Sequence, residues 1–89
     1  MIADDFVAVV DGVAFEENGR IWTLEVADVD DSSPERFTVT VEVLGTGADL
    51  LFDVPRDRPL DSEPLRDHVV GLARDLVIGR QKSGLVTEL

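Results

Sequence analysis

The chain has 89 residues, and 19 acidic against 8 basic side chains give it a formal net charge of −11. A chain of this length supplies one domain with one hydrophobic core. Without a basic cluster, direct nucleic-acid binding and adhesion to an anionic membrane are not expected. The absence of cysteine excludes disulfides, thiolate catalysis and cysteine-ligated metal sites.

The first residues are acidic where a secretory signal would be basic, and the longest apolar run, Phe6 to Val10, is too short to span a membrane. The sequence therefore predicts a cytoplasmic protein. Lys82 is the single lysine beside seven arginines. This balance is typical of a halophilic or high-GC prokaryote, or of a phage of one, in which acidity keeps proteins soluble.

In chain order, the run Phe6 to Val10 predicts a short strand that ends at Asp11-Gly12. Asn18-Gly19, between apolar alternations, is typical of a hairpin turn, so a strand is expected on either side of it. In the second of these strands Trp22, Leu24 and Val26 share one face.

An acidic loop is expected from Asp28 to Pro34, and a strand with clear period-2 alternation follows from Phe37 to Leu44. After the turn at residues 45–47, Leu50, Phe52 and Val54 alternate with more polar positions until Pro55 ends the strand. Short connections predict antiparallel pairing of neighbours.

Residues 55–60 read as a linker, and residues 62–79 as an amphipathic helix that ends near Gly79. Its apolar stripe contains Leu65, Val69 and Leu72. For the tail, residues 80–89, a frayed end and an edge strand both fit.

The predicted fold is a single α+β domain over residues 1–89, in which strands lie within residues 5–54. A four- or five-stranded antiparallel meander sheet carries one C-terminal helix on one face. The other face stays bare, and it holds polar and acidic side chains as a solvated face should. These candidate contact residues are Thr23, Glu25, Thr38, Thr40 and Glu42.

Catalytic and metal-binding patterns are weak. His68 is the only histidine and borders the apolar stripe, so a packed or solvated role is expected. None of the serines at 32, 33, 62 and 83 lies in a glycine-rich elbow, and Ser62 or Asp61 suits a helix cap. Asp28 to Ser32 begins like a calcium loop, but Ser33 stands where that loop requires glycine.

Two pairs of carboxylates could face each other, Glu25 with Glu42 and Asp49 with Asp53. Acid–base catalysis by such a pair requires one partly buried member, so that the two pKa values differ. Both pairs are expected on the solvent side, which argues against this role. We therefore expect no catalytic residue, no cofactor and no bound metal.

Three functions remain open from sequence. The favoured one is a non-enzymatic binding or regulatory domain that contacts another protein or a second copy of itself. The second is an acidic mimic of nucleic acid that inhibits a defence or DNA- or RNA-processing enzyme. The third is an enzyme or small-ligand binder with a pocket between helix and sheet that uses Trp22, His68 and Asp61.

Overall fold

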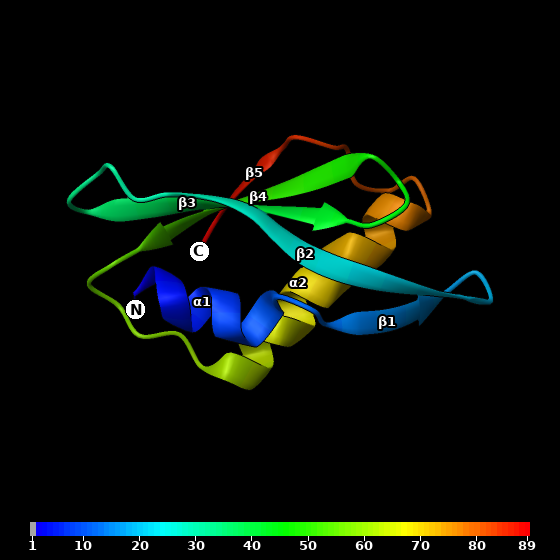
Figure 1. The fold of residues 1–89 in the computed structure, drawn as a ribbon, viewed down its shortest axis with the longest axis horizontal. Coiled ribbons are helices and arrows are strands. Elements are labelled where there is room, and N and C mark those ends of the chain that lie inside the picture. The colour runs from blue at the N-terminus through cyan, green and yellow to red at the C-terminus, as the bar shows by residue number, and fades with distance from the viewer. Residues whose placement is uncertain (1) are drawn as a thin grey trace.

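A computed structural model describes residues 2–89 and confirms the α+β class. Two helices and five strands follow one another along the chain (Figure 1). Their bounds are α1 (Ala3–Val10), β1 (Ala14–Glu17), β2 (Arg20–Asp30), β3 (Arg36–Val43), β4 (Ala48–Pro55), α2 (Ser62–Val77) and β5 (Val86–Glu88).

The sheet is mixed, with strand order β1-β2-β3-β4-β5. The first four strands pair antiparallel with their sequence neighbours, as the short connections predict. The prediction of a fully antiparallel sheet is wrong, because β5 pairs parallel to β4, with Val86 beside Leu51. Helix α2 carries the chain back to the end of the sheet where β4 begins, so the next strand runs in the same direction as β4. The tail thus forms an edge strand.

The predicted first strand is also wrong, since residues 6–10 belong to helix α1. Valines favour strands, but a short apolar run does not by itself distinguish a strand from a buried helix. Asp4 and Asp5 lie in the first helical turn, where acidic side chains interact favourably with the helix dipole. Phe6 and Val10, one turn apart, are both buried, so the helical spacing places them together in the core.

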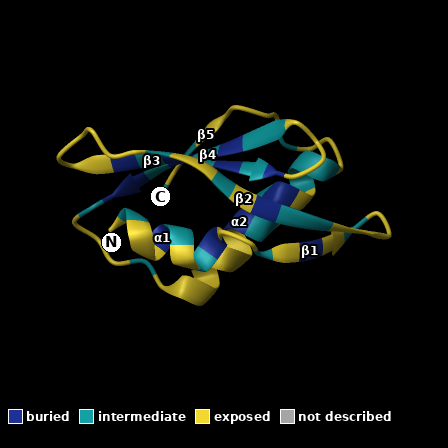
Figure 2. Cartoon of the chain, in the orientation of Figure 1, coloured by how far each residue is buried: buried dark blue, intermediate teal, exposed yellow. Residues whose placement is uncertain are grey.

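Both helices pack on the same face of the sheet (Figure 1). Buried residues of the helices and the strands, coloured dark blue in Figure 2, form one hydrophobic core. The Phe6 ring meets Phe37 edge-on at 6.4 Å and Phe52 at 5.7 Å between centroids. From α2, Leu65, Val69 and Ala73 join this core, together with the inward positions of β3 and β4. The predicted contact between helix and sheet is therefore present, and a second helix adds to it.

Helix α2 ends close to the predicted boundary. It spans Ser62–Val77, and Gly79 just beyond it has a φ of +83°, a left-handed conformation that favours glycine after a helix. Asp61 stands at the N-cap position without a side-chain capping bond. The helix start is therefore stabilised by packing of Leu65 and Val69 more than by a cap.

Candidate protein-contact face

The five predicted contact residues lie on the sheet face opposite the helices. Glu25 and Glu42 are direct partners across β2 and β3. Thr38 and Thr40 alternate along β3 with Val39 and Val41, which are 0% exposed in the core. Thr23, on the same side of β2, is partly exposed, and its carbonyl accepts a hydrogen bond from the Leu44 N–H at 3.0 Å. We call this surface the outer face.

Acidic side chains cross the outer face in two rows. The first acidic row joins Glu25, Glu42 and Asp49, which are aligned across β2, β3 and β4. The second acidic row consists of Asp30, Asp53 and Glu88, on β2, β4 and β5, with Thr38 between the first two. The first row thus joins three consecutive strands, whereas Glu88 brings a carboxylate from the far end of the chain into the second.

A less polar row lies between the two acidic rows. Thr40, Leu51 and Val86 are aligned across β3, β4 and β5, and Asp28 ends this row on β2. We call the first three residues the apolar row, in which Leu51 and Val86 are the apolar members and Thr40 contributes a methyl group beside its hydroxyl. Val86 is 57% exposed and Leu51 is partly exposed, so apolar surface remains open between carboxylates.

Like charges are close together on this face. Residues directly opposite on antiparallel strands have Cβ atoms about 5 Å apart, so the first acidic row brings three carboxylates together without an intervening base. Among the strand residues that the structure describes, Arg36 is the one base at an outer-face position, and its Nη1 lies 3.4 Å from Asp53 Oδ2. The face is therefore strongly negative.

Sequence reasoning missed part of this face because a β-bulge changes the alternation of β2. The register shifts between Val26 and Asp28, and Val29 then returns to the side of Val39. As a result Asp28 and Asp30, expected in a loop, are strand residues that face outward. The Asp-Val-Asp alternation of residues 28–30 was the available signal. Val86 and Glu88 belonged to the tail whose structure the sequence left open.

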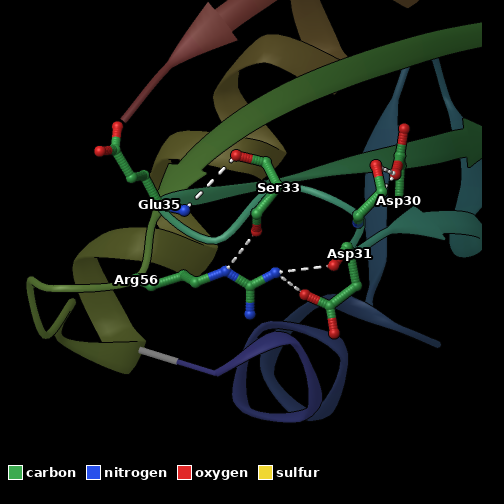
Figure 3. A network of polar contacts seen from close by, with 6 residues as sticks. Asp30, Asp31, Ser33, Glu35 and Arg56 are labelled. Atoms are coloured by element: carbon green, nitrogen blue, oxygen red, sulfur yellow. Dashed lines mark hydrogen bonds and ion pairs between the residues drawn. The ribbon is translucent and has the colours of Figure 1, made fainter.

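Beyond β2, the connection to β3 is held by Arg56 (Figure 3). Its Nε donates to the Ser33 carbonyl at 3.0 Å, and its Nη2 donates to the Asp31 carbonyl at 3.0 Å and also pairs with the Asp31 carboxylate. The guanidinium lies 5.7 Å from the Phe37 ring centroid. This loop is thus fixed to the end of β4, and the end of the outer face has a defined shape.

Two hydrogen bonds from Ser32 stabilise the ionised form of the Asp30 carboxyl. The Ser32 hydroxyl donates to Asp30 Oδ1 at 2.6 Å, and the Ser32 backbone N–H donates to the same oxygen at 3.1 Å. These two bonds, the hydroxyl first, lower the pKa of Asp30 below its ordinary value of 3.8. The carboxylate at this corner is therefore ionised across the neutral range.

The calcium-like stretch does not form a loop of converging ligands. Asp28 and Asp30 are in β2, Ser32 is bonded to Asp30, and Asp31 is paired with Arg56. Within residues 2–89, no group of three or more histidine or acidic side chains is arranged to hold a metal ion.

The three residues of the alternative pocket lie apart. His68 is exposed and lines an open hollow of about 440 Å³ with Leu72 and Asp75, and neither Trp22 nor Asp61 lines it. Trp22 lies beside Phe15, and its indole N–H donates to the Glu17 carbonyl at 3.0 Å. Its ring is also covered by Arg20, at 4.5 Å. The structure does not combine these residues into one site.

No helix in the described part of the chain is long and apolar enough to cross a membrane. Comparison of the chain with protein-family models, with curated proteins and with solved structures finds no match. The functional assignment therefore rests on the geometry of the outer face.

Proposed function

We propose that this protein is a non-enzymatic binding domain that acts through protein–protein contact, and that its outer face binds a basic surface of another protein. The observation that carries the proposal is the alignment of carboxylates from β2, β3, β4 and β5 on a sheet face that no helix or strand within residues 2–89 covers. Partner choice through complementary charge is a common use of such a surface.

The same charge argues against a symmetric pair of copies that meet through this face. A two-fold interface places the same patch of both subunits against each other. Here it would place carboxylates of the two acidic rows against carboxylates of the other copy, with Arg36 as the one base among the outer-face strand residues that the structure describes. We therefore favour another protein over a second copy as the occupant of this face, and a cytoplasmic partner in keeping with the cytoplasmic location proposed for the chain.

A charge-reversal pair tests the proposal. The variant Glu25→Lys/Glu42→Lys reverses two charges of the first acidic row, and Glu35→Lys/Asp67→Lys makes the same change of charge at exposed positions of a loop and of α2. Each tagged chain is used to capture proteins from cells of its source at 50 mM and 300 mM salt. We expect the native chain and the control to retain a basic protein at low salt, the face variant to lose it at least tenfold, and high salt to weaken it.

Equal capture by the face variant and the control would contradict the proposal. The alternative of nucleic-acid mimicry is separated in the same experiment by adding duplex DNA. If DNA releases the captured protein, the domain occupies that protein's nucleic-acid groove. If DNA has no effect, the domain binds a basic surface of another kind.

A further inference from the structure

We infer that the partner presents to the outer face an amphipathic helix with a narrow apolar stripe flanked on both sides by lysine or arginine. The inference rests on the proposed function and specifies the shape of the partner. The juxtaposition that carries it is the apolar row, which runs across β3, β4 and β5 between two parallel acidic rows.

The spacing of the rows matches the width of a helix. Along β4, Asp49, Leu51 and Asp53 belong to the first acidic row, the apolar row and the second acidic row. Four residues of strand separate the outer two, which is about 13 Å. A helix with its side chains is about 10–12 Å wide. A helix laid over Leu51 therefore places its two flanks above the two acidic rows.

The length of the row also suits a helix that crosses the strands. Neighbouring strands lie about 4.8 Å apart, so the apolar row across β3, β4 and β5 covers about 10 Å. At about 1.5 Å per residue, a segment of about seven helical residues spans it. Its stripe would contact Thr40, Leu51 and Val86, and basic residues on either side would meet Glu42 and Asp49 or Asp53 and Glu88.

The middle of this face favours side-chain recognition over strand addition. An extended segment joins a sheet at an edge, where main-chain N–H and C=O groups are unpaired. The first acidic row and the apolar row lie mainly on β3 and β4, which are paired on both sides. Helices already cover the opposite face, and a helix on this face would complete a third layer of a kind common in mixed α and β domains.

Synthetic peptides test the inference on the full chain. The probe is a peptide of about 14 residues with leucines on one helical stripe and lysines on both flanks. Its control has the same composition in an order that separates neither leucine nor lysine onto a helical face. Amide NMR titration is expected to show shifts centred on Thr40, Leu51 and Val86, with at least tenfold tighter binding of the amphipathic peptide, which becomes helical by circular dichroism.

A variant of the apolar row separates this mode from simple charge attraction. Leu51→Asp adds a carboxylate to the face but removes its central apolar side chain, and Ile78→Asp adds the same charge at the exposed end of α2. Both chains are first checked for native circular dichroism. We expect Leu51→Asp to weaken the amphipathic peptide at least fivefold and Ile78→Asp to leave it nearly unchanged, whereas charge attraction alone would make Leu51→Asp bind more tightly.

The possible failures are distinguishable. If both peptides bind the outer face equally, or if the shifts follow the free edge of β2 or β5, the helical partner is wrong while the acidic face remains a binding surface for basic segments. If neither peptide shifts the outer face at low salt, both the helical partner and the proposed function are wrong.

Discussion

The two faces of strand β3 differ strongly in burial and polarity. Phe37, Val39, Val41 and Val43 point into the core and are at most 1% exposed. Thr38, Thr40 and Glu42, their immediate neighbours, remain partly exposed on the outer face. Because successive side chains of a strand point to opposite sides, stability and partner contact are carried by alternate residues of the same segment.

This separation has a functional consequence. The outer face can be changed in charge or shape without disturbing the packing of α1 and α2 against the sheet. Conversely, its carboxylates contribute little to folding, and the first acidic row opposes it through repulsion. A row of like charges on this face fits the proposal that the charges meet an opposite charge on a partner.

The largest expected effect is the difference in stability between two neighbouring substitutions, one on each face of β3. Val41→Asp places a carboxylate in the core, where Val41 is 0% exposed, and no base is available there. We expect a loss of about 4 kcal/mol or more in the free energy of unfolding, sufficient to unfold most of this small domain. Thr40→Asp, one residue away on the outer face, is expected to remain folded, as measured by urea denaturation followed by circular dichroism.

The same pair checks the strand assignment. If both variants unfold, the outer face is covered by part of the chain and the two-sided description of β3 is wrong. If both remain folded with similar midpoints, Val41 does not lie in the core.

A smaller effect of opposite sign is expected on the outer face itself. Glu42→Gln removes the middle charge of the first acidic row, between Glu25 and Asp49. Relief of two like-charge contacts is expected to raise the free energy of unfolding by about 0.5 kcal/mol at low salt, and salt should reduce this gain through screening. Urea midpoints at 20 mM and 500 mM salt measure it, and Glu35→Gln, in an exposed loop, is the control.

A gain of equal size in Glu35→Gln would mean that overall charge, and not the row, is responsible. A loss of stability in Glu42→Gln would mean that this carboxylate has a favourable partner in the folded protein.

The sequence predicts the inner face better than the outer one. Alternation in residues 37–43 and 50–54 identifies the core strands, and the stripe of Leu65 and Val69 identifies α2. In both cases the apolar residues recur with the period of the element that buries them. The valine-rich run of α1 does not distinguish a strand from a helix, since five consecutive apolar residues fit a strand as well as a buried helix turn. Packing of Phe6 between Phe37 and Phe52 decides in favour of the helix.

Much of the candidate site depends on the pairing register between strands, which the local sequence pattern does not predict. Glu25 and Glu42 are found from alternation alone, but Asp28 and Asp30 reach the outer face only through the bulge in β2. Val86 and Glu88 arrive there only because α2 returns the chain parallel to β4. The two acidic rows and the apolar row between them are thus products of tertiary structure.

The smallest expected effect concerns the corner of the second acidic row. In Ser32→Ala the hydroxyl that donates to Asp30 Oδ1 at 2.6 Å is lost, while the backbone N–H at 3.1 Å remains. Because the hydroxyl is the largest cause of the lowered pKa, we expect the pKa of Asp30 to move upward toward 3.8, measured by NMR titration of the side-chain carboxyl.

The direction of the pH dependence follows from the same bonds. A carboxyl whose pKa is lower in the folded than in the unfolded chain stabilises the fold at neutral pH, and this stabilisation is lost as the pH falls through its folded pKa. Ser32→Ala should therefore lose part of this contribution at pH 7 and show a weaker dependence of stability on pH in the acid range. Ser83→Ala, which removes a hydroxyl bonded to the Asp49 backbone N–H, should leave the Asp30 titration unchanged. An unaltered pKa of Asp30 in Ser32→Ala would show that the serine hydroxyl does not hold this carboxylate in solution, and that the corner of the outer face is less ordered than the hydrogen bonds indicate.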